Sequence, residues 1–310
     1  MQINLPSSRS LASLRLRGLC VYPAGSLPWL LAALLLMAAG CTPSQLVVRG
    51  AMPLMAGGDL AMNRETDLQL ARDAIPATIK LLEGMLVSDP DNSRLRIHAA
   101  QAFYGYGYSF VEREDPARAA RFYRRCVGHA KVALKNAGLA GDVESLALPE
   151  LRRTVAGLGE KALPGLFWTA SCMAKLADVR RTDPATIAKL GRAALLMERV
   201  LELDETYYHG GPHLFFGVYY GGRAPMVGGD FHKAERHFAR AREITGGRLL
   251  IVDLLYAEYL ARQRLDRESF HTRLTRVIEA PADLFPDMAL ANAVAQDRAR
   301  HLLRMESEWF

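Results

Sequence analysis

The stretch from Tyr219 to Asp230, YYGGRAPMVGGD, sets two Gly-Gly pairs around Arg223 ahead of a helical pattern. Such a loop could cradle a phosphate at a helix N-terminus. A phosphate cradle also needs an incoming strand and usually a Lys-Ser/Thr pair, whereas the preceding LFFGVYY is helical in pattern. Asp230 at the N-cap would accept helix N–H groups and repel an anion. We therefore expect the loop to be a turn between two helices, with Asp230 as the N-cap of the second helix, and we expect no nucleotide site.

The histidines of His209-Gly-Gly-Pro-His213, with His232 and His237 nearby, could form half of a metal site. Zinc needs three or four converging ligands. The Gly-Gly pair predicts a turn at His209, and Pro212 suits a first helical turn, so the two imidazoles need not share a face. We expect capping and packing at a helix start, with no metal and no cofactor.

Signatures of catalysis are missing from the chain: it has no GxSxG, HExxH or CxxC. Glu112, Glu114 and Asp115 cluster before Pro116, where we expect a solvated helix boundary. Two carboxylates that together catalyse hydrolysis of a substrate would have to face each other across a cleft. The chain is therefore expected not to be an enzyme, and an exported hydrolase is kept as an alternative.

Four cysteines occur, of which Cys20 and Cys41 lie near the N-terminus. Cys126 and Cys172 lie on helical patterns among apolar neighbours, where a free cysteine behaves as a small core residue. An oxidising compartment would permit a disulfide between them. The pattern favours free thiols.

Residues 1–40 have the character of a secretory signal: three arginines, no acidic residue, and an apolar run from Leu27 to Ala39 that is short for a bilayer span. The run ends in LMAAGC, which resembles the lipobox of bacterial lipoproteins and predicts lipidation of Cys41. We expect a periplasmic protein held to the membrane only by this lipid. Thr42, which follows the cysteine, favours the outer membrane.

The basic balance of the chain comes partly from this signal. Three of the 39 Lys and Arg residues precede residue 41, which leaves 36 against 33 Asp and Glu. No basic run with interleaved aromatic residues follows, so a nucleic-acid partner is not expected.

The rest of the chain predicts an all-α protein. Residues 41–62 have no clear period and are interpreted as a lipidated tether. From about Glu65, apolar residues recur at spacings of three and four, broken by turn signals such as DPDN, EDPA and TDPA. Residues 63–310 are therefore expected to form a single helical domain.

Recurring offsets within these helices are typical of degenerate tetratricopeptide-like repeats. Gly217 and Tyr220 fit a first helix that crosses its partner closely, and Asp89-Pro90 fits the end of another helix. Positions four and seven residues on fit the second helices, as in Ala234-Phe238-Ala241, Ala119-Tyr123-Cys126, Ala193-Met197-Val200 and Phe270-Leu274-Val277.

Three segments carry a family resemblance: LLEGMLVSDPDNSRLRIHAAQAFYGYGYSFVERED, GLFWTASCMAKLADV and HGGPHLFFGVYYGGRAPMVGGDFHKAERHFARAREI. In order and spacing they resemble the T-components of tripartite ATP-independent periplasmic (TRAP) transporters. The resemblance implies a periplasmic lipoprotein that engages the solute-binding subunit of the transporter, a small organic ligand, and assembly as a homo-oligomer. A general scaffold for envelope assembly is the alternative.

Aromatic residues gather in two places, around Tyr104 to Phe110 and around Phe215 to Tyr220. Most are expected to be core, but tyrosines turned toward a concave helical surface would offer apolar area with a hydrogen-bonding edge. The candidates for contact with a partner or ligand, including the loop tip, are Tyr104, Tyr108, His213, Tyr219, Tyr220, Arg223 and Met226.

Overall fold

The computed structural model describes residues 42–310. The predicted signal peptide and the predicted lipidation of Cys41 lie outside the described residues. The chain divides into two compact units, residues 1–46 and residues 47–310. Every regular element among residues 42–310 is helical, which confirms the all-α prediction.

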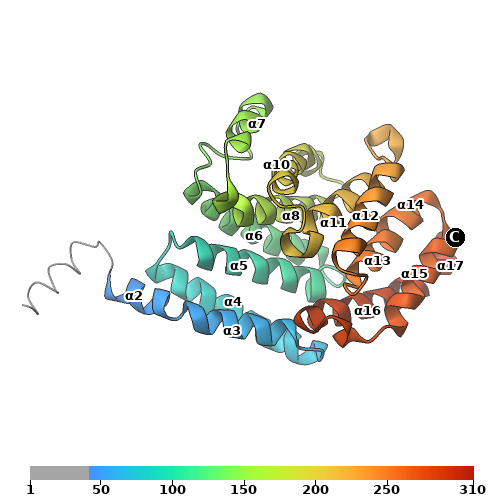
Figure 1. Ribbon diagram of the computed structural model, residues 1–310, viewed down its shortest axis with the longest axis horizontal. Helices are drawn as coiled ribbons and strands as arrows, with labels where there is room; N and C mark the ends of the chain where they lie inside the picture. Colours follow the sequence, from blue (N-terminus) through green and yellow to red (C-terminus); the bar gives the residue numbers. More distant parts are fainter. Residues whose placement is uncertain (1–41) are drawn as a thin grey trace, which may run out of the picture. The chain divides into compact units, whose positions relative to one another are not determined.

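The elements follow one another with short connections (Figure 1). The N-terminal half comprises α2 (Pro43–Gly50), α3 (Met52–Asn63), α4 (Leu68–Ser88), α5 (Ser93–Tyr106), the π-helical turn η1 (Gly107–Val111), α6 (Pro116–Asn136), α7 (Leu148–Ala156), η2 (Glu160–Ala162), α8 (Leu163–Val179) and α9 (Pro184–Ile187). The C-terminal half comprises α10 (Leu190–Leu203), α11 (Tyr207–Gly221), η3 (Pro225–Val227), α12 (Phe231–Ile244), α13 (Ile251–Leu255), the π-helical turn η4 (Tyr256–Ala261), α14 (Arg262–Arg264), α15 (Arg267–Glu279), η5 (Ala282–Leu284), η6 (Pro286–Met288), α16 (Ala289–Arg304) and α17 (Glu306–Trp309).

Asp and Asn side chains start many of these helices. The Oδ1 atom of Asp230 accepts the Lys233 backbone N–H at 3.0 Å, which confirms the predicted N-cap of α12. This bond satisfies one of the N–H groups left free at a helix start. The same arrangement occurs at Asp67, Asn92, Asp115, Asp183 and Asp266.

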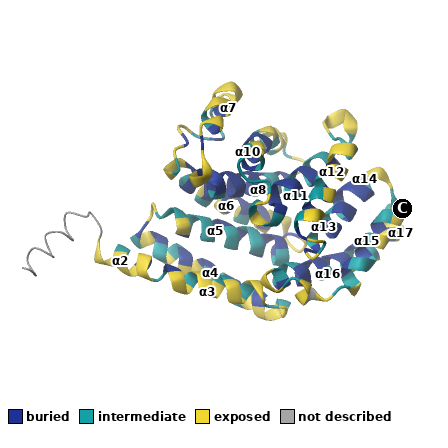
Figure 2. Cartoon of the chain, viewed as in Figure 1, coloured by how far each residue is buried: buried dark blue, intermediate teal, exposed yellow. Residues whose placement is uncertain are grey.

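The main packed pairs are helices close in sequence: α5 with α6, α6 with α8, α8 with α10, and α11 with α12. Figure 2 shows buried residues along the inner faces of these helices. Each of the four predicted triplets is at most 2% exposed. Gly217 explains the closeness of α11 and α12, because a Cβ there would lie 2.9 Å from the ring of Phe238. The prediction that Gly217 marks a close helix crossing is confirmed.

Cys126 on α6 and Cys172 on α8 form a disulfide, so the preference for free thiols is wrong. Their Cα atoms lie 5.9 Å apart, within the range that a disulfide requires. Both residues are fully buried among the apolar side chains of one core. An apolar helical pattern is the same for a free and a bonded cysteine, so it could not separate the two cases.

The segment expected to be an irregular tether is helical, as α2 and α3. Val48 and Met52 are buried in a small cluster with Leu82 and Leu86 of α4. Gly57 and Gly58, which weakened the sequence pattern, have open space beside them and do not interrupt α3. Packing against α4 and α5 therefore outweighs the low helix propensity of glycine.

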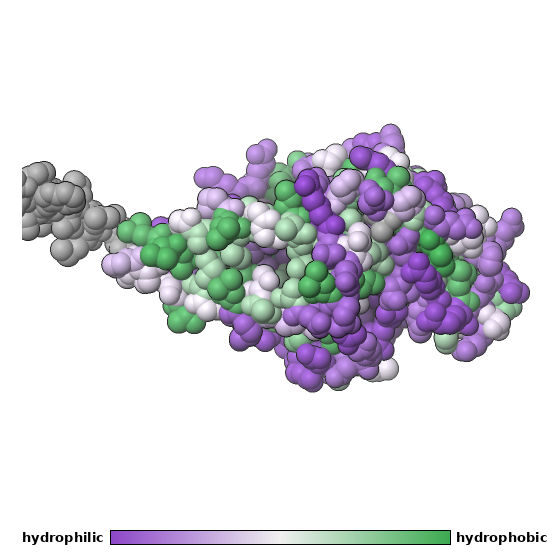
Figure 3. Space-filling model, turned by 90° about the horizontal axis from the view of Figure 1, so that it is seen from below, coloured by the Kyte–Doolittle hydropathy of each residue, from purple (hydrophilic) through white to green (hydrophobic). Residues whose placement is uncertain are grey.

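Several apolar side chains are exposed on the N-terminal helices. Leu54 on α3 is 80% exposed and Val87 on α4 is 84% exposed. Figure 3 shows hydrophobic side chains gathering toward this end of the described chain, on the face seen from below.

Three clusters of buried apolar residues make up the described core, and all three lie within residues 47–310. One spans α4 to α11, the second spans α12 to α16, and the third joins α2 and α3 to α4 and α5. The unit therefore has its own hydrophobic core and is expected to fold without the residues before it.

Candidate functional site

A cavity of about 730 Å³ lies among α5, η1, α8, α11, α13, η4 and α16. Its size falls within the range of about 300–1,000 Å³ that is usual for small-molecule sites. Its apolar lining includes Ile187, Leu190, Leu214, Phe215, Val218, Leu249, Ile251, Leu255, Leu290 and Val294. Such a lining suits a ligand with a substantial apolar part.

Aromatic side chains build one wall of the cavity. The Trp168 ring contacts the rings of Tyr104 and Tyr208 edge-on, with centroids 5.4 and 5.0 Å apart. Phe215 and Tyr219 stack further along α11 at 5.9 Å. Aromatic side chains from α5, α8 and α11 therefore all contribute to this wall.

An unusual backbone places Tyr208 in this wall. Tyr208, His209 and Gly210 have φ angles of 48°, 59° and 77°, all in the left-handed region. Residues other than glycine rarely adopt this conformation, and such strain concentrates at functional sites. The turn predicted at His209 and the helix start at Pro212 are confirmed.

The ionic floor of the cavity comprises the lining residues Lys175 and Asp178 and their partners Glu112 and Arg298, which do not themselves line it. The Lys175 ammonium lies 2.7 Å from an Asp178 carboxylate oxygen and 3.0 Å from one of Glu112. Arg298 donates to Glu112 at 2.8 Å and to the Tyr108 backbone carbonyl at 3.0 Å. The floor thus joins η1, α8 and α16 through charge-assisted hydrogen bonds.

The prediction that Glu112 lies at a solvated helix boundary is wrong. Glu112 is only 9% exposed and belongs to this ionic floor. Glu114, by contrast, binds Arg72 at 2.7 Å, and Asp115 caps α6. The three acids therefore have different partners. None of these contacts places two of the acids opposite each other across a cleft.

Three polar atoms beside the cavity are buried without a hydrogen-bond partner. They are Tyr108 Oη, Trp168 Nε1 and Arg223 Nη2. Burial raises the pKa of Tyr108, so its phenol is neutral and able to donate. Buried polar groups in native proteins are nearly always hydrogen-bonded, so three unpartnered atoms at one cavity favour a ligand with oxygen atoms.

The glycine loop stands at one side of this cavity. Arg223 and Val227 both line it, and Val227 is also 62% exposed. Met226, beside it in η3, is 91% exposed. The loop therefore presents apolar side chains outward while it borders the cavity.

Apart from the exposed Met226, the predicted contact residues fall into two groups. Tyr104, Tyr108, Tyr219 and Arg223 line the cavity. His213 and Tyr220 instead pack around His237 between α11 and α12, with His213 Nδ1 3.0 Å from His237 Nδ1. Trp168, Tyr208 and Lys175 also line the cavity, although sequence reasoning did not select them.

The histidines are not arranged as a metal centre. His209 packs edge-on against Phe285, whereas His213 packs against His237. His213 Nε2 is bonded to Glu205 at 3.0 Å. Among residues 42–310, no three His, Cys, Asp or Glu side chains are placed to hold a metal ion together.

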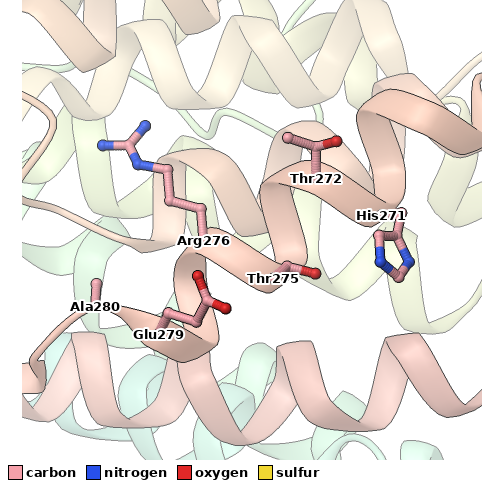
Figure 4. A pocket seen from close by; sticks show the side chains of 6 residues that line it. All are labelled: His271, Thr272, Thr275, Arg276, Glu279 and Ala280. Atoms are coloured by element: carbon pink, nitrogen blue, oxygen red, sulfur yellow. The ribbon is translucent and has the colours of Figure 1, made fainter.

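A second hollow lies on α15 (Figure 4), where its six lining residues come from one helix and the residue after it. Arg276 and His271 in it are engaged with Asp253 and Glu306, at 3.0 and 2.9 Å. We assign no site to this open surface.

The fold of the described residues is all-α, and its helices enclose a cavity with a largely apolar and aromatic lining. The family model of the TRAP transporter T-component matches residues 64–310, and the chain belongs to this family. Its role is thus associated with a TRAP transporter, as the sequence resemblance predicted. An uncharacterized protein of Treponema pallidum (strain Nichols) is 21% identical over 262 residues, which cover 79% of this chain and 81% of that protein.

Membership in this family associates the protein with the cell envelope or periplasm. Within residues 42–310, no helix has both the length and the apolar character needed to cross a membrane.

Proposed function

We propose that this T-component is a non-catalytic, lipid-anchored periplasmic protein that binds the solute-binding subunit of its TRAP system and holds a small organic ligand. The observation that carries the proposal is the position of the glycine loop. Val227 belongs both to the cavity lining and to the exposed loop tip, so a protein docked on the loop would lie beside the ligand. Loops held by a rigid scaffold commonly carry binding function.

The docking test uses residues 42–310 and the TRAP solute-binding subunits encoded in the same genome, measured by calorimetry with and without solute. A partner that must load and leave should bind with roughly micromolar affinity, about 8 kcal/mol. Met226→Ser should weaken binding about tenfold, because this exposed side chain would be buried in the complex. The matched control is Val87→Ser, an apolar residue on α4 that is 84% exposed, compared with 91% for Met226, and that should leave affinity unchanged.

Helical content and melting should stay the same in both variants, since exposed positions contribute little to the core. Failure of every solute-binding subunit to bind would remove the docking proposal and favour a scaffold in envelope assembly.

The proposed anchor is tested by Cys41→Ser in the full chain, expressed in a bacterium. Loss of acyl labelling and a change in membrane fractionation are expected, because the cysteine sulfur would carry the diacylglycerol. Fractionation of the wild-type protein would also test the proposed outer-membrane location. Unaltered labelling of the variant would show that Cys41 is not the lipidated residue.

A further inference from the structure

Charged side chains at the cavity do not balance among the described residues. Lys175 and Arg181 both contact Asp178, and Lys175 also contacts Glu112. Arg223 lines the same cavity but forms no ion pair with any carboxylate of residues 42–310. Among the described residues, Arg223 is thus a cavity-lining cation that forms no ion pair with a carboxylate.

Contacts with Tyr219 fix the position of this cation. Arg223 Nε donates to the Tyr219 carbonyl at 2.9 Å, and the guanidinium carbon lies 3.8 Å from the centre of the Tyr219 ring. Its Nη2 is buried and has no hydrogen-bond partner. A guanidinium held in this way is ready to pair with a carboxylate without losing further side-chain freedom.

The remainder of the cavity would accept an apolar body. Phe215 and Val218, on the same helix as Tyr219, line it beside apolar residues of α13 and α16. The other unpartnered atoms, Tyr108 Oη and Trp168 Nε1, are uncharged donors that would suit oxygen substituents.

We propose that the cavity binds an amphiphilic anion, with its apolar body among α8, α11, α13 and α16 and its single carboxylate paired with Arg223. The inference specifies the ligand of the proposed function and rests on it, but it does not depend on docking to a transport subunit. A neutral or cationic molecule of the same shape would leave Arg223 Nη2 buried without a hydrogen-bond partner, which is costly.

The test displaces a neutral fluorescent probe, N-phenyl-1-naphthylamine, from residues 42–310. Dodecanoate, dodecanol and dodecyltrimethylammonium, all below their micelle concentrations, share one chain and differ in head group. Dodecanoate should bind about tenfold more tightly than dodecanol, and the cation more weakly than either, because a charged hydrogen bond is gained only by the carboxylate.

Arg223→Gln should abolish the preference for dodecanoate and leave dodecanol binding unchanged. Arg262→Gln is the matched control: its guanidinium also stacks on a ring, 3.6 Å from the centre of Trp309, but lies outside the cavity lining. This control should keep the tenfold preference.

Equal binding of the three head groups to the wild-type protein, or no displacement by any of them, would overturn the inference without reference to a variant. A carboxylate preference that survives Arg223→Gln would overturn the assignment to this arginine. If dodecanoate binds but no solute-binding subunit docks, the docking proposal alone is rejected. The ligand inference is then retained.

Discussion

Glu112 is a buried carboxylate that its neighbours keep ionised. Burial alone would raise its pKa, but Lys175 and Arg298 more than offset this and lower it. The pKa of Lys175 is raised although burial opposes this, because Asp178 and Glu112 favour its charged form. The floor is therefore a set of mutually neutralising ions, and removing one partner would leave another charge buried and unpaired.

His237 gives the fold a dependence on pH. Burial first, and then the neighbouring His213, lower the pKa of His237 to about 4. The unfolded chain, with an ordinary histidine pKa, binds a proton below about pH 6.5 that the folded state does not. The contribution of His237 is thus fully present above about pH 6.5, and the free energy of unfolding falls as pH drops from there toward 4.

Urea unfolding measured between pH 7.5 and 5 checks this. His237→Gln should make the pH slope shallower by at most about 1.4 kcal/mol per pH unit, the value for one proton. His232→Gln, at an exposed position of the same helix, is the matched substitution control. An unchanged slope in the His237 variant would contradict the assignment. Burial also lowers the pKa of His129 to about 4, so part of the slope should remain.

At the scale of elements, the disulfide between α6 and α8 closes a loop of 46 residues. Chain-entropy arguments assign about 4 kcal/mol to a loop of this length. The double variant Cys126→Ala/Cys172→Ala should therefore lose about 4 kcal/mol of unfolding free energy, together with packing around both sites. The wild-type protein is also denatured with and without a reductant that opens the bond. Equal denaturation midpoints under the two conditions would contradict this prediction.

The helices and their buried faces could be predicted because the signal is local. Ala234, Phe238 and Ala241 show their spacing within one helix, and each is at most 2% exposed. The same holds for the caps, since Asp230 bonds a backbone N–H three residues on. Both kinds of signal lie within one or two turns of the chain.

The cavity and the disulfide depend on residues far apart in the sequence, and this limits prediction. Tyr108 and Arg298 meet across 190 positions, and no spacing rule relates them. Tyr208 enters the wall only because three successive residues adopt left-handed angles, of which only Gly210 was visible as a candidate. Met226 was selected as a loop-tip residue and is exposed, although Val227 beside it is the one that reaches the cavity.

At the scale of the whole described unit, the cavity lies where the two main cores meet. Phe167 and Trp168 belong to the core of α4 to α11, whereas Leu249 belongs to the core of α12 to α16, and all three line it. Any shift of one core against the other would change the volume open to a ligand. The bond from Arg298 to Glu112 opposes such a shift, because it connects α16 to the end of the π-helical turn η1.

The buried disulfide also sets an order of events during biogenesis. Neither Cys126 nor Cys172 is exposed in the folded unit, so an oxidant cannot reach the sulfur atoms once α6 and α8 have packed. The bond is therefore expected to form before these helices finish packing, in a compartment that oxidises thiols. A chain secreted to the periplasm would accordingly have to cross the inner membrane before it folds, and the oxidising machinery there would act on it before the core closes.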